Sequence, residues 1–163
     1  MKLRFLTESY ETLKVSGFGQ DVANVSEEHA LELMAPEVKE AYYGIEKIID
    51  ELFKNHKKRR GFGEIEPHLN DCRVAWTIEE PINQEIDPAD DWEDQFGARY
   101  IYIELEYERG LNNPSLEIFA RSPEIEKETV IGSESARFGD HYEFNLYYIR
   151  QMLVGYKAKV FGR

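Results

Sequence analysis

The sequence has little of what stabilises a secreted or a membrane protein. Its single cysteine, Cys72, excludes a disulfide within the chain. No run approaches the roughly 18 consecutive apolar residues of a membrane-spanning helix. The opening stretch MKLRFLTESYETLKV also lacks the apolar core of a secretion signal. These absences predict a cytoplasmic protein with no membrane partner.

The sequence also lacks the patterns that hold cofactors, metals or nucleophiles. Gly-x-Gly occurs at 17–19 and 61–63, but neither copy continues into a dinucleotide fingerprint or a P-loop, so we predict turns there. The four histidines are scattered and Cys72 has no second cysteine, which argues against a structural zinc site. The sequence thus predicts no cofactor, no metal and no catalytic residue, and it favours a binding protein over an enzyme.

Positive charge is missing from the middle of the chain. No lysine or arginine occurs between Arg73 and Arg99. Residues 64–143 carry 6 basic and 21 acidic side chains, a local net charge of −15, whereas the whole chain carries −12. The last 20 residues have four basic side chains and no acidic one. A negative charge of this size promotes solubility and attracts a basic partner, although salt screens its electrostatic field beyond roughly 8 Å.

Helical periodicity is clearest between residues 26 and 52. Ser26 is a preferred N-cap residue, and a short helix is predicted from there to about Met34. Pro36 suits the first position of a second helix. The apolar residues of that helix recur at spacings of three and four: Val38, Ala41, Tyr42, Ile45, Ile48, Ile49 and Leu52. A final helix, capped by Asp140, is predicted through the apolar stretch FNLYYIRQMLVGY.

The basic run KKRR at 57–60 comes directly after the second helix. We interpret it as the end of that helix, where positive charge complements the helix dipole and Gly61 provides the cap. Two alternatives stay open. The run could form a phosphate-binding patch that docks on nucleic acid, or it could pair with the acidic region at 64–143 of this chain. The negative central segment opposes docking on nucleic acid.

From residue 72 the apolar residues alternate with polar ones, as in strands with one buried face. This pattern predicts strands at 72–78, 99–109 and 116–121. The turn residues GLNNP join the last two strands into a hairpin. Weaker signals predict strands at 129–131 and 2–6.

Together these elements predict one α+β domain that spans residues 1–163. Its sheet is antiparallel with about three to five strands, and the helices pack on one face while the other face meets solvent. The predicted core contains Trp76, Ile103, Ile118, Ile45 and Ile49. Cys72 lies on the apolar side of its strand and is predicted to be a core residue as well.

One strand of the hairpin carries a regular row of acidic side chains. Glu104, Glu106 and Glu108 occupy alternate positions about 6.7 Å apart, so we expect an exposed row on the solvent face of the sheet. Glu79 and Glu117 would widen the row if they share that face. With two tyrosines and the acids of the preceding loop, the predicted partner-binding residues are Tyr100, Tyr102, Glu104, Glu106, Glu108, Asp90, Asp91, Glu93 and Asp94.

These features predict a small acidic protein-interaction module. Its expected partner is a basic protein surface, that of a nucleic-acid-binding protein, which the module would block by imitating nucleic acid as inhibitors from phages or mobile elements do. No direct contact with nucleic acid is expected. The alternative is a metal-dependent hydrolase or nuclease, in which the acids of loop 85–94 and Glu104 or Glu106 would bind Mg²⁺ or Ca²⁺.

Overall fold

The structure is a computed structural model that describes residues 10–15, 21–66, 70–80, 99–112, 114–123, 132–137 and 145–162, with 132–137 described by their backbone alone. Its strands are β1 (Tyr10–Thr12), β2 (Val22–Val25), β3 (Lys57–Ile65), β4 (Asp71–Glu79), β5 (Tyr100–Glu108), β6 (Ser115–Arg121) and β7 (Gly132–Arg137). Its helices are α2 (Glu27–Leu33), α3 (Pro36–Leu52) and α4 (Leu146–Phe161).

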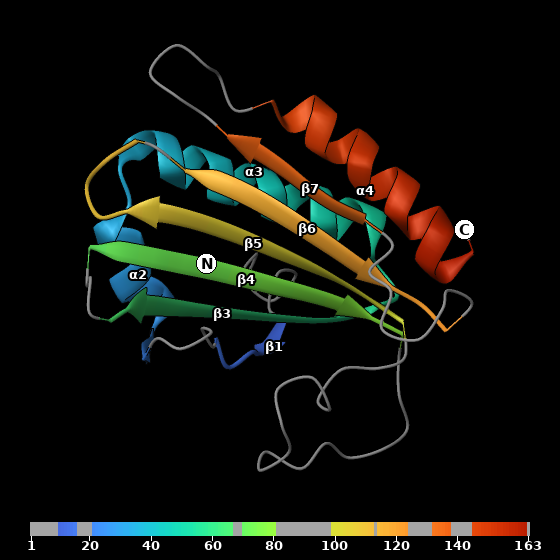
Figure 1. The fold of residues 1–163 in the computed structure, drawn as a ribbon, viewed down its shortest axis with the longest axis horizontal. Helices are drawn as coiled ribbons and strands as arrows, with labels where there is room; N and C mark the ends of the chain where they lie inside the picture. The colour runs from blue at the N-terminus through green and yellow to red at the C-terminus, as the bar shows by residue number, and fades with distance from the viewer. Residues whose placement is uncertain are drawn as a thin grey trace, which may run out of the picture.

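The strands form one twisted sheet in the order β1-β3-β4-β5-β6-β7, and β2 pairs with β3 beside β1 (Figure 1). Only the pairing of β1 with β3 is parallel among the described strands. The mixed helix and strand content and the mostly antiparallel sheet confirm the predicted α+β class. The sheet has more strands than the three to five predicted. The placement of every helix on one face stays a prediction.

Alternate residues of β4, β5 and β6 lie on two sides of the sheet. One set packs with residues of all three described helices, and we call its side the cluster face: Cys72, Val74, Trp76, Ile78, Ile101, Ile103, Leu105, Tyr107, Leu116, Ile118 and Ala120. The other set defines the opposite face: Asp71, Arg73, Ala75, Thr77, Glu79, Tyr100, Tyr102, Glu104, Glu106, Glu108, Ser115, Glu117, Phe119 and Arg121. The five predicted core residues are all fully buried, and Cys72 is buried with them.

The helix ends follow local sequence signals. Ser26 caps α2, where its hydroxyl accepts a hydrogen bond from the backbone N–H of His29 at 3.1 Å. Pro36 begins α3 as predicted. The cap of α4 is Asn145, and the predicted cap Asp140 lies outside the described residues. Gly162 ends α4 with φ 77°, a left-handed conformation that glycine adopts without steric cost.

The basic run 57–60 belongs to a strand, so its assignment to a helix end is wrong. Helix α3 ends at Leu52, and the run begins β3, which pairs with β1, β2 and β4. The turn predicted at 61–63 is wrong for the same reason. The segment that follows β1 passes over β3 at Gly61. A Cβ on Gly61 would lie 1.9 Å from the backbone oxygen of Leu13, so this position requires glycine.

Several predicted features lie outside the described residues. They are the strands at 2–6 and 129–131, the Gly-x-Gly at 17–19, and the acidic loop with Asp90, Asp91, Glu93 and Asp94. A strand that sequence patterns did not predict, β7, follows at 132–137. None of the described helices combines the length and the apolar character needed to cross a membrane.

Candidate functional site

Three side chains of the basic run pair with acids of the same chain, and the fourth, Lys58, binds a backbone oxygen. Lys58 and Arg59 are only 4% and 5% exposed. Lys58 donates to the backbone oxygen of Phe53 at 2.9 Å, and Lys57 lies 3.4 Å from a carboxylate oxygen of Glu11. This burial contradicts the interpretation of the run as a phosphate-binding patch. The alternative of pairing with the acidic region holds for Arg59, which pairs with Glu79, whereas Glu11, Glu27 and Glu46 lie outside that region.

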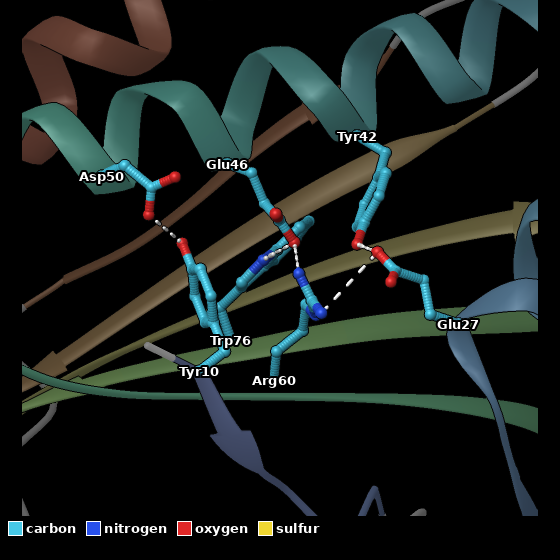
Figure 2. Close-up of polar contacts among 7 residues, drawn as sticks. All are labelled: Tyr10, Glu27, Tyr42, Glu46, Asp50, Arg60 and Trp76. Carbon is cyan, nitrogen blue, oxygen red and sulfur yellow. Dashed lines mark hydrogen bonds and ion pairs between the residues drawn. The ribbon is translucent and has the colours of Figure 1, made fainter. Parts of the chain in front are cut away.

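Arg60 is the centre of a polar network between α3 and the sheet (Figure 2). Its guanidinium pairs with Glu46, which also accepts a hydrogen bond from the indole N–H of Trp76 at 3.4 Å. A second guanidinium nitrogen lies 3.6 Å from Glu27, which accepts the hydroxyl of Tyr42 at 2.6 Å. Arg60 therefore ties β3 to both α2 and α3.

A neighbouring hydrogen bond extends the network to β1. The hydroxyl of Tyr10 donates to Asp50 at 2.9 Å, and the guanidinium of Arg60 lies 4.9 Å from the centre of the Tyr10 ring. Burial raises the pKa of Glu46, and the Arg60 guanidinium opposes this rise. Burial also raises the pKa of Asp50, and the hydrogen bond from the Tyr10 hydroxyl opposes it. Both acids therefore hold protons to higher pH than exposed carboxyls do.

A cleft of about 540 Å³ lies beside this network and is lined by residues of β1, β2 and β3. Tyr10, Glu27, Arg60 and Phe62 are among the residues that line it. Because Arg60 is already paired with Glu46 and Glu27, we interpret the network as structural. Sequence reasoning missed it, although Tyr42, Glu46 and Asp50 recur every four residues and so share one side of α3.

A second buried pair lies on the opposite face. Arg59 donates to the carboxylate of Glu79 through two nitrogens, at 2.8 and 3.3 Å, and the two side chains are 6% and 0% exposed. The hydroxyl of Thr77 donates to the same carboxylate at 3.3 Å. Glu79 does share the face of the predicted acidic row, but it serves as an internal ion-pair partner there.

The predicted acidic row does lie along one face of β5, but only part of it is exposed. Glu108 is exposed, the Glu106 side chain is 45% exposed, and Tyr100 is half-buried. The expected exposure of Glu104 and Tyr102 is wrong, since each is only 8% exposed.

Two structural causes bury these side chains. Leu13 and Val15, which follow β1, pack with Tyr102 and Ala75 in a second hydrophobic cluster on this face. In addition, the guanidinium of Arg73 on β4 forms an ion pair with the Glu104 carboxylate.

Two acids of this face pair with one arginine, and three more lie nearby in the sheet register. The guanidinium of Arg73 lies 3.2 Å from Glu104 and donates to Glu106 at 2.7 Å. The sheet register places Glu117 opposite Glu104, and Asp71 opposite Glu108. We call this group the acidic cluster: Asp71, Glu104, Glu106, Glu108 and Glu117. Two of these five carboxyls pair with Arg73, and the other three make this part of the face negative, so that it can recognise positive charge.

Glu104 has the most perturbed carboxyl of the cluster. Burial raises its pKa from 4.5 to about 7. The Tyr102 hydroxyl, which donates to Glu104 at 2.7 Å, and the Arg73 guanidinium both oppose this rise, whereas Glu106 adds to it. Glu104 therefore exchanges its proton near neutral pH.

This perturbed pKa gives a testable dependence of stability on pH. Between pH 4.5 and 7 the folded protein holds a proton on Glu104 that the unfolded chain releases, so stability falls as pH rises through this window. The loss is about 3 kcal/mol at most. Urea denaturation at a series of pH values should show a flatter profile for Glu104→Gln than for the wild-type protein. Equal slopes in the two proteins would contradict the assigned pKa.

The remaining candidate residues form no reactive centre in the described part of the chain. Burial raises the pKa of the Cys72 thiol to about 11, which agrees with a core role. His29 pairs with Glu64 at 2.6 Å. No group of three or more His, Cys, Asp or Glu side chains within the described ranges is arranged to hold a metal ion.

Comparisons with protein-family models, with curated proteins and with solved structures found no match to this chain.

Proposed function

We propose that this chain is a small acidic protein-interaction module that binds a basic surface of a nucleic-acid-binding protein. The observation that carries the proposal is the pairing of the basic run 57–60 inside the structure. Its partners include Glu11, Glu27, Glu46 and Glu79, none of which belongs to the acidic cluster. The basic run therefore does not neutralise the cluster, in which Arg73 pairs with Glu104 and Glu106.

The contact surface is the accessible part of the acidic cluster, with the exposed Glu108 and the half-buried Glu106 and Glu117 as its charged residues. Tyr100 extends the same face and offers an aromatic contact. Carboxylates at alternate positions of a strand lie about 6.7 Å apart, and such a row attracts the basic groups that otherwise bind phosphates. The module thus competes with nucleic acid for its partner. By sequence, Asp90, Asp91, Glu93 and Asp94 add to this surface.

Competition with nucleic acid tests the proposed function. The immobilised chain is exposed to a nuclease-treated lysate of its native host, and the captured protein is purified. We expect a basic protein that releases its nucleic acid as the chain is added, with an affinity that falls as salt rises. A partner that binds the chain and nucleic acid together would contradict the imitation of nucleic acid. Capture that does not respond to salt would contradict the charged interface itself.

A further inference from the structure

Helices α3 and α4 carry an exposed apolar surface on a side of the molecule that the proposed function does not use. Five large hydrophobic side chains are exposed among the described residues, and four of them belong to these two helices. They are Tyr43, Tyr147, Tyr148 and Val154, at 55%, 73%, 50% and 43% exposure. Such a concentration is typical of an interface.

The outward side of α4 has no charged residue along its centre. The buried residues Ile149, Leu153, Tyr156 and Val160 recur along the inward side. Half a turn away, Tyr147, Gln151, Val154 and Ala158 are all exposed and recur at spacings of four, three and four. This spacing is that of a helix that packs on both sides.

Gly155 adds a second observation on the same side of α4. It lies inside a helix, where glycine costs about 1 kcal/mol relative to alanine. Gly155 is exposed, and a Cβ at this position would meet no atom of the described chain within 4 Å. Packing within the described chain therefore does not require glycine here, whereas a second helix that approaches closely would.

The charges on this surface are complementary to one another. Leu146 packs on Gly44 and Phe161 packs near Phe53, so α3 and α4 run in the same direction. The amino end of α3 exposes Glu37 and Glu40. The carboxyl end of α4 carries Lys157 and Lys159, and α4 contains no acidic residue. Glu37 and Glu40 thus lie at one end of the surface and Lys157 and Lys159 at the other, while Glu51, near the carboxyl end of α3, is paired with Arg150.

We propose that this surface, the outer faces of α3 and α4, is the interface of a homodimer. A two-fold axis perpendicular to the helices brings the basic end of each copy over the acidic end of the other. Tyr147 of one copy then packs near Val154 of its partner, close to Gly155. A second copy fits because each surface contains both halves of the complementary pair.

Sedimentation of the purified chain over about a hundredfold range of concentration tests this inference. We expect the wild-type protein to be dimeric at the upper end, and Val154→Lys to be monomeric throughout. Leu111→Lys, which changes the fifth exposed hydrophobic residue, should leave the dimer intact. A wild-type protein that stays monomeric would overturn the proposal and leave the surface to a different partner.

A charge swap tests the orientation of the two copies. Lys157→Glu with Lys159→Glu should weaken the dimer at least tenfold, and so should Glu37→Lys with Glu40→Lys. The four substitutions combined in one chain should restore dimerisation, because the opposite charges face each other again. A combined variant that stays monomeric would overturn the proposed arrangement. Circular dichroism establishes that each variant remains folded.

Discussion

Replacement of Glu79 by alanine is expected to lower the free energy of unfolding by about 3–5 kcal/mol, the loss typical of breaking a buried ion pair. Arg59 would keep its charge in the interior without the carboxylate that now accepts two of its hydrogen bonds. The hydroxyl of Thr77 would lose the same acceptor. Urea denaturation with linear extrapolation measures the change.

Two further variants separate the effect of burial from that of the pair itself. Arg59→Met combined with Glu79→Leu removes both charges and should recover most of the lost stability. Arg150 and Glu51 form an equally short pair at 2.6 Å, but their side chains are 39% and 41% exposed. Glu51→Ala should therefore cost far less. Equal losses in Glu79→Ala and Glu51→Ala would contradict the account of the buried pair.

The sequence predicted the elements whose periodicity is strong and local. Alternation identified β4, β5 and β6, and the spacing of Val38, Ile45 and Ile49 identified α3. Ser26 and Pro36 marked helix starts because the N-cap hydroxyl and the first-turn proline depend on local sequence alone. The hairpin of β5 and β6 followed from the turn residues between them.

The basic strand β3 could not be predicted from the same patterns. Its first four residues are all charged, so no alternation of apolar and polar residues appears. The chain pairs three of them with acids distant in sequence, as Arg59 with Glu79 and Arg60 with Glu46, and Lys58 with the nearby backbone oxygen of Phe53. Long basic side chains can also lay their apolar stems against a core. Only the three-dimensional arrangement shows which partners they meet.

The burial of Glu104 has a similar cause. Alternation placed Glu104 correctly on the same face as Glu106 and Glu108. It did not show what covers that face. Leu13 and Val15 pack there after crossing β3 at Gly61, and Arg73 comes from the neighbouring strand. The predicted residues of β5 therefore share one face of the sheet, on which Glu108 is exposed and Glu106 and Glu117 are half-buried.

Reversing the charges of the exposed Glu108 and the half-buried Glu117 is expected to weaken partner binding strongly. Glu108→Lys with Glu117→Lys changes the face by four charge units and leaves the contacts of Arg73 with Glu104 and Glu106 in place. Association with a basic partner should slow by roughly 10- to 100-fold at low salt, because electrostatic steering is lost. Folding should be little affected, since neither side chain is buried and charges in contact with water contribute little stability individually.

The most direct test of the proposed acidic interface compares this variant with a matched control. Glu28→Lys with Glu32→Lys makes the same change of charge on exposed positions of α2. The measurement is the association rate and dissociation constant for the captured partner at low and at physiological salt. We predict a large loss for the cluster variant, a small one for the control, and a difference that shrinks as salt rises. Equal binding by the two variants would contradict a specific acidic surface on β5 and β6.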